Sequence, residues 1–110
     1  MTAQELCAVM AERRTSRDSG GSTFHPPIPK LTCNDGFQLS VQASKYHYCE
    51  PREDALPFYS LVEVGYPSEE EPLLMPYVEE KSNPLQTVYG YVPSEVVAEV
   101  ITKHGGLKND

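Results

Sequence analysis

The stretch KYHYCEPRED, residues 45–54, gathers residue types that are common in catalysis and in recognition. His47 and Cys49 stand two positions apart, so on an extended strand their side chains would share one face. An imidazole placed there could lower the pKa of the thiol and activate it as a nucleophile. No recognisable orienting acid, oxyanion site or cysteine-hydrolase signature accompanies the pair. A thiol enzyme at these two residues is therefore the third-ranked hypothesis.

A metal site is the other chemistry that these residue types could support. Cys33, His47 and Cys49, with His25 or His104, are of ligand type, but H-x-C is the only close pair among them. Structural zinc usually takes ligands in close pairs such as C-x2-C, because one turn then holds two ligands before the metal arrives. We therefore predict no metal and no cofactor, rank a metal enzyme with the thiol enzyme, and assign no role to His25 or His104.

Carboxylates are frequent, but their arrangement does not suggest acid–base catalysis. Glu69, Glu70 and Glu71 are adjacent and lie among prolines, which is typical of a solvated charge run. General acid–base catalysis requires one carboxyl that burial has pushed toward its neutral form. The sequence also contains no phosphate-binding loop and no common hydrolase motif. We predict that the protein is not an enzyme.

Composition and charge narrow the choice of partners. A chain of 110 residues suits one domain. Its formal net charge is −7, whereas nucleic-acid-binding domains usually carry a basic surface that binds phosphates. We therefore expect no direct nucleic-acid binding. Apolar runs are a few residues long, which argues against a membrane span. Glu5 and Glu12 make the first residues unlike a signal peptide, and three cysteines suggest reduced thiols in the cytoplasm.

The elements that would position these residues can be placed along the chain. Residues 2–14 are expected to form a helix because Thr2 and Glu5 can cap it reciprocally. Its apolar stripe of Leu6, Val9 and Met10 is narrow, which predicts a loosely attached helix. Residues 15–29 are rich in Ser, Thr, Gly and Pro and should be a linker. We therefore divide the chain into residues 1–29, helix plus flexible linker, and a domain over residues 30–110.

Within that domain, period-two patterns predict four strands. They cover residues 30–34, 37–43, 58–66 and 87–92. The first two flank a turn at Gly36. In the last, Tyr89 and Tyr91 should point away from Val88 and Val92, with Gly90 leaving a gap in the valine face that could let a helix or another backbone come close. A helix should follow from Pro93 to Gly105, with Glu99 and Lys103 paired. Its stripe contains Val96, Val97, Val100, Ile101 and His104. The expected fold is α+β, a mainly antiparallel four-stranded sheet with the C-terminal helix packed on one face.

The remaining features favour binding over catalysis. Seven tyrosines without a tryptophan could form an aromatic surface, because tyrosine offers a broad ring with one polar tip. The expected partner-binding residues are Tyr46, Tyr48, Arg52, Glu69, Glu70, Glu71 and Tyr77. Several tyrosines could equally just cover the sheet, and Arg52 could equally neutralise Glu53 or Asp54. The alternative function is binding of a small ligand or nucleotide by Tyr46, Tyr48 and Arg52, since arginine binds acidic groups in a fork.

Three segments carry a resemblance to a known group of proteins. GFQLSVQASKYHYCEPRED, VEVGYPSEEEP and TVYGYVPSEVVAEVITKHGG resemble a family of small phage- and prophage-encoded proteins without an assigned function. The likeness covers about residues 30–106 and carries over no catalytic residue. It implies an accessory protein in the host cytoplasm that binds a host protein and inhibits host machinery, including defence systems. The oligomeric state stays open.

Overall fold

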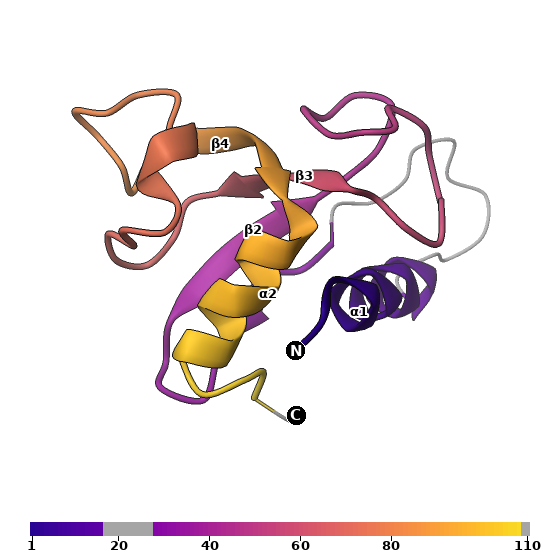
Figure 1. The fold of residues 1–110 in the computed structure, drawn as a ribbon, viewed down its shortest axis with the longest axis horizontal. Coiled ribbons are helices and arrows are strands. Elements are labelled where there is room, and N and C mark those ends of the chain that lie inside the picture. The colour runs from indigo at the N-terminus through magenta and orange to yellow at the C-terminus, as the bar shows by residue number, and fades with distance from the viewer. Residues whose placement is uncertain (17–27, 109–110) are drawn as a thin grey trace.

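The computed structural model describes residues 1–16 and 28–108, and these form an α+β fold (Figure 1). Of the linker predicted at residues 15–29, positions 17–27, including His25, lie outside the described residues. The described elements are α1 (Ala3–Ser16), β1 (Leu31–Thr32), β2 (Gln38–Gln42), β3 (Leu61–Gly65), η1 (Met75–Tyr77), β4 (Val88–Pro93) and α2 (Ser94–Lys103). The strands pair antiparallel in the order β1-β2-β3-β4, which confirms the predicted fold class.

The hairpin of β1 and β2 follows the period-two pattern of the sequence. Gly36 has φ +95° in the connecting turn, a conformation that favours glycine. Leu31 pairs with Leu39, and the alternating apolar positions of the second strand are all buried. These positions are Phe37, Leu39, Val41 and Ala43. The two strands are shorter than predicted, but their inner face is the expected one.

β4 contains a bulge that the sequence did not reveal. Tyr91 has φ +53°, and the two residues Gly90 and Tyr91 stand opposite the single residue Glu63 of β3. The extra residue shifts the alternation, so Tyr89 and Val92 are both buried while Tyr91 is exposed. The prediction that Tyr89 and Tyr91 point the same way is therefore wrong. Both tyrosines would have shared a face only on a regular strand.

α2 ends the sheet region and covers one of its faces (Figure 1). Val97, Val100 and Ile101 are fully buried, as the apolar stripe predicted. Gly105, with φ +91°, follows the helix end as a left-handed residue. The pairing of Lys103 differs from the expectation, because its ammonium lies 2.9 Å from Glu71 of a distant loop instead of bonding Glu99 on the same helix.

α1 is held more closely than the sequence predicted. The reciprocal cap is present, since the backbone N–H groups of Thr2 and Glu5 donate to each other's side chains at 2.8 and 3.1 Å. Leu6, Cys7 and Met10 are buried in the same hydrophobic core as the sheet and α2, and the Cys7 thiol contacts the backbone of Tyr59 at 3.5 Å. The small buried residues Ala3 and Cys7 widen the apolar stripe of α1 beyond the three residues that the sequence predicted. α1 therefore shares one core with the sheet and α2.

Neither outer edge of the sheet is left open. Beside β4, the Glu79 N–H donates to the Val88 carbonyl at 3.1 Å, and the Tyr91 N–H donates to the Tyr48 carbonyl at 3.0 Å. Beside β1, the Lys108 N–H donates to Thr32 at 2.9 Å. Covered edges disfavour recognition by strand addition.

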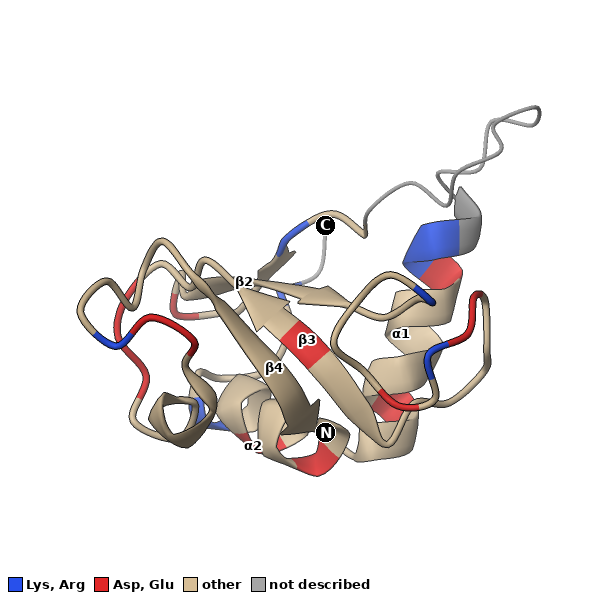
Figure 2. Cartoon of the chain, turned by 90° about the horizontal axis from the view of Figure 1, so that it is seen from above, with Lys and Arg blue, Asp and Glu red and all other residues tan. Residues whose placement is uncertain are grey.

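Charged residues gather in the loops that flank the sheet and on the helices (Figure 2). None of the described helices has the length and apolar character needed to cross a membrane.

Candidate functional site

The loop after β2 exposes aromatic side chains and buries its cysteine. The strand does not continue into this loop, whose residues 44–48 form turns and bends. Tyr46 is 73% exposed and Tyr48 is 44% exposed, whereas Cys49 is buried. His47 is half-buried, and its Nδ1 lies 2.6 Å from the Ser44 hydroxyl. The predicted sharing of a strand face by His47 and Cys49 does not occur, because the chain turns between them.

The geometry at Cys49 does not favour a nucleophilic thiol. Its Sγ donates to the Ser44 carbonyl at 3.1 Å, and burial raises the pKa of the thiol. A reactive cysteine instead needs a lowered pKa and an exposed sulfur. The other thiols are also free and buried, and burial raises the pKa of Cys33 to about 11. Within residues 1–16 and 28–108, no group of three His, Cys, Asp or Glu residues could hold a metal ion.

Two tyrosines and an arginine from separate segments form an exposed cluster. The bulge of β4 turns Tyr91 outward next to Tyr48, with ring centroids 5.8 Å apart. The guanidinium carbon of Arg52 lies 6.0 Å from the centre of the Tyr48 ring. With Tyr46 on the same loop, these residues are called the tyrosine surface below. Three were predicted from the sequence; Tyr91 was not, because its orientation depends on the bulge.

Gly90 brings the acidic loop, residues 67–84, against the tyrosine surface. A Cβ added at Gly90 would lie 3.3 Å from the Cβ of Tyr48 and 3.2 Å from a carboxylate oxygen of Glu79. Both neighbours therefore pack over the space that this glycine leaves. Glu69 and Glu70 are exposed elsewhere in the loop, whereas Tyr77 is half-buried in η1 and packs against the core.

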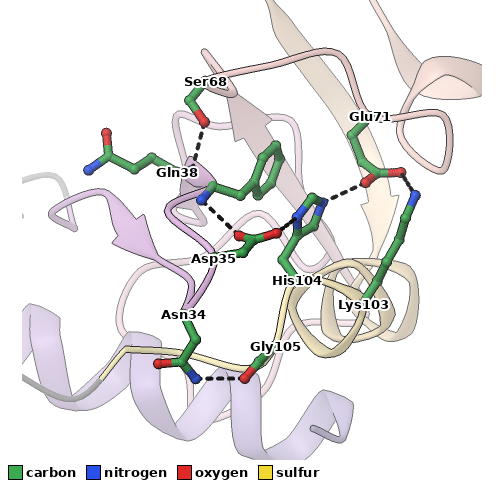
Figure 3. Close-up of polar contacts among 9 residues, drawn as sticks. Asn34, Asp35, Gln38, Ser68, Glu71, Lys103, His104 and Gly105 are labelled. Atoms are coloured by element: carbon green, nitrogen blue, oxygen red, sulfur yellow. Dashed lines mark hydrogen bonds and ion pairs between the residues drawn. The ribbon is translucent and has the colours of Figure 1, made fainter.

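Glu71 does not belong to a solvated charge run, which corrects the prediction for this residue. It is 2% exposed and reaches toward α2 (Figure 3). Its Oε2 accepts from the Lys103 ammonium and from the Leu73 N–H, each at 2.9 Å, and its Oε1 lies 2.8 Å from His104 Nε2. Burial raises the pKa of Glu71, but these hydrogen bonds outweigh it and lower the pKa overall. Glu71 is thus a buried anion and not a surface contact.

His104 joins the same cluster from the end of α2. Its Nδ1 lies 2.6 Å from Asp35 in the β1–β2 turn, while its Nε2 faces Glu71 (Figure 3). Two ring nitrogens that face two carboxylates can both donate only when the imidazole is charged. Burial lowers the pKa of His104, but the bonds to Asp35 and Glu71 outweigh it and raise the pKa. Asp35, Glu71, Lys103 and His104 are called the carboxylate–histidine network below.

A cavity opens on the side of the sheet that carries the polar residues of β2 and β3. Its volume is about 260 Å³, and Ser40, Gln42, His47, Glu63, Gly65, Tyr66 and Val88 line it. Glu63 supplies a carboxylate there, with Oε2 accepting from the Tyr48 N–H at 3.1 Å. We refer to this feature as the sheet cavity. Sequence reasoning missed it, although Gln42 and Glu63 occupy outward positions of strands that were predicted.

Comparison of the chain with protein-family models, with curated proteins and with solved structures finds no match. These comparisons therefore assign no family to the chain. In the carboxylate–histidine network Glu71 and His104 are buried and bond to the exposed Lys103 and Asp35, as expected of a stabilising cluster. The tyrosine surface and the sheet cavity are accessible, as expected of a contact with another molecule.

Proposed function

We propose that this protein is a small non-enzymatic binding protein whose tyrosine surface contacts a partner protein. The observation that carries the proposal is the pair Tyr48 and Tyr91, each 44% exposed, with Arg52 above the first ring. Tyrosine and arginine dominate the residues whose removal costs most binding energy in protein interfaces. Scattered exposed aromatic residues are ordinary on protein surfaces, but two rings in contact with a cation over one of them resemble an interface centre.

The cluster is also held in place before any partner arrives. The Tyr48 N–H donates to Glu63, and the Tyr48 carbonyl accepts from the Tyr91 N–H, so the backbone of one tyrosine is bonded to both β3 and β4. Rigid aromatic side chains lose little conformational entropy on binding. This preorganisation supports a recognition role for the tyrosine surface.

We further propose a host protein with a basic surface as the partner. The likeness of residues 30–106 to small phage-encoded proteins supports a host cell, and inhibition of host defence machinery is the role that this likeness implies. Glu69, Glu70, Glu79 and Glu80 are exposed in the acidic loop, and Glu79 packs beside Tyr48. Negative potential beside an aromatic cluster favours a positively charged partner.

The proposal is tested by affinity capture from host lysate followed by binding measurements with the purified partner. Wild type should retain a specific protein, and the variant Tyr48→Ala/Tyr91→Ala should bind that protein at least thirtyfold more weakly, about 2 kcal/mol. Phe58→Ala is the matched control, since Phe58 is also an exposed aromatic but lines a separate cavity with Met1 and Glu95. Retention of nothing, or equal binding by the double variant and the control, would contradict the proposal.

A small anionic ligand is the second candidate, because Arg52 lies over the Tyr48 ring and could hold a phosphate against it. A panel of nucleotides in a thermal-shift assay tests this alternative. A nucleotide present at 100 times its Kd should stabilise the fold by about 2.7 kcal/mol. Arg52→Gln should abolish the shift, and an unchanged melting temperature across the panel would reject the ligand.

A further inference from the structure

We propose that the sheet cavity receives an arginine side chain of the partner protein, with its guanidinium paired to Glu63. This inference rests on the proposed function, since it names the chemistry by which the same partner is recognised. The cavity lies next to the tyrosine surface, because Tyr48 belongs to that surface and its N–H donates to the Glu63 carboxylate at 3.1 Å. A partner bound on Tyr48 would therefore place side chains within reach of Glu63.

The size of the cavity favours a single side chain over a free small molecule. Pockets for small molecules usually measure about 300 to 1,000 Å³ and are mainly apolar. The sheet cavity measures about 260 Å³ and opens to solvent, and Ser40, Gln42, His47 and Glu63 add polar groups to a lining whose surface is mainly apolar. A small open feature with a few polar groups and apolar walls suits one extended side chain that the rest of a protein interface holds in place.

The charge of the cavity favours a cation. Glu63 is the only acidic residue of its lining, and it makes no ion pair with a lysine or arginine among residues 1–16 and 28–108. Its Oε2 accepts from Tyr48, whereas Oε1 accepts no hydrogen bond within the same ranges. Lys30, which approaches the rim, donates to the carbonyl of Tyr66 at 3.2 Å. A half-buried carboxylate whose second oxygen accepts no hydrogen bond is stabilised most by a charged donor.

The shape of the lining favours arginine over lysine. His47 and Tyr66 contribute flat rings, on which a planar guanidinium can stack. Ser40 adds a hydroxyl, so an arginine could bond to Glu63 and Ser40 through separate N–H groups. Gly65 and Val88 supply apolar surface for the methylene stem, with the Cβ position of Gly65 only 3.6 Å from Val88. A lysine ammonium could pair with the Glu63 carboxylate but has no planar group to stack on the rings.

NMR titration with N-acetyl-arginine-N-methylamide tests the inference without the partner. We expect concentration-dependent shifts of the backbone amides of Ser40, Gln42, Glu63 and Gly65. Glu63→Gln, which keeps the acceptor for the Tyr48 N–H but removes the charge, should weaken this binding at least tenfold. Glu95→Gln is the matched control, because Glu95 is an exposed glutamate on α2, away from the cavity. The citrulline analogue, which is uncharged and of nearly the same shape, should not bind.

Equal shifts with the citrulline analogue, unchanged binding by Glu63→Gln, or shifts confined to the acidic loop would each overturn the inference. Its failure can be told apart from failure of the proposed function. Loss of partner binding in Tyr48→Ala/Tyr91→Ala together with no response to the arginine probe would leave the tyrosine surface as the contact and reject the cavity. A specific response to the probe with no partner retained by the protein would reject the proposed function alone.

Discussion

Glu69, Glu70 and Glu71 are chemically identical neighbours with different surroundings. The first two are exposed, whereas Glu71 is 2% exposed and accepts hydrogen bonds from Lys103, His104 and the Leu73 backbone. A buried carboxylate is tolerated only when its charge is paired and its oxygens accept hydrogen bonds. Glu71 therefore fixes the acidic loop to the C-terminal end of α2, while its neighbours remain available to a partner.

This contrast predicts a large difference between two adjacent substitutions. Glu71→Gln should lower the free energy of unfolding by about 3 kcal/mol, because it removes a buried anion that pairs with the buried His104 and with Lys103. Glu70→Gln should change it by about 0.5 kcal/mol or less, as expected at an exposed position. Urea unfolding of both variants at pH 6 measures the difference. Equal stability of the two variants would show that Glu71 does not anchor the loop.

His104 should make stability depend on pH through its charged form. The groups that face it are Asp35 from the β1–β2 turn, Glu71 from the acidic loop, and Lys103 beside it on α2. A raised folded-state pKa means that its contribution is fully present below the ordinary value of 6.5 and is lost as pH rises through the folded-state value. The pKa of Glu71 is lowered, so its contribution holds above 4.5 and is lost at lower pH.

Unfolding of wild type and His104→Gln at pH 6 and pH 9 measures this contribution. The variant should be destabilised by about 3 kcal/mol at pH 6 and by less at pH 9, because the contribution of the charged imidazole falls as pH rises through its raised pKa. His47→Gln is the control, because the ring of His47 contacts a serine hydroxyl and not a carboxylate. A destabilisation of His104→Gln that is the same at both pH values would contradict a charged His104.

At the scale of elements, the sequence predicted those features that depend on neighbours along the chain. The alternation at 37–43 and the stripe of α2 identified β2 and α2 because a local period reports which face is buried. The bulge in β4 was missed, since a left-handed Tyr91 is imposed by pairing with β3 and has no signature such as glycine at that position. The Tyr48–Tyr91 contact depends on that bulge and could not be predicted either.

The carboxylate–histidine network was missed for a related reason. His104 is 69 residues from Asp35 and 33 from Glu71, and only the antiparallel sheet with α2 across it brings the three together. Local composition placed Glu71 on a proline-rich charged loop and left His104 as one polar end of an amphipathic stripe. Tyr48 and Arg52 could be grouped from the sequence because they are close along the chain, and the guanidinium lies 6.0 Å from the centre of the ring.

The attachment of α1 is an element-scale question with a direct test. Leu6 is fully buried in the common core, so Leu6→Ala should lower the free energy of unfolding by about 2 to 5 kcal/mol. Leu85→Ala changes the same residue type at a position 41% exposed and should cost less than about 1 kcal/mol. Chemical denaturation followed by circular dichroism compares the two. A small effect at Leu6 would instead support the loosely attached helix that the sequence suggested.

At the scale of the whole molecule, the fold separates stabilising carboxylates from accessible ones. Glu71 is buried and pairs within the fold. The other glutamates of the acidic loop stay exposed beside the sheet (Figure 2), namely Glu69, Glu70, Glu79 and Glu80. The covered sheet edges leave the faces and loops as the surfaces for recognition. Under the proposed function, the negative field attracts the partner over a distance, and the tyrosine surface holds it after contact.

That division of roles predicts separate kinetic effects of two sets of substitutions. Neutralising Glu69, Glu70, Glu79 and Glu80 to glutamine removes four of the 16 acidic charges and should lower the association rate constant for the captured partner about tenfold at low salt, with little change in dissociation. Tyr91→Ala should instead accelerate dissociation, because most affinity differences at one interface lie in that step.

Surface plasmon resonance at 50 and 300 mM NaCl measures both rates. Added salt should slow wild-type association and leave the glutamine variant nearly unaffected, since screening acts on exposed charges. Slower association in Tyr91→Ala, or faster dissociation in the glutamine variant, would show that charge and aromatic contact do not divide in this way.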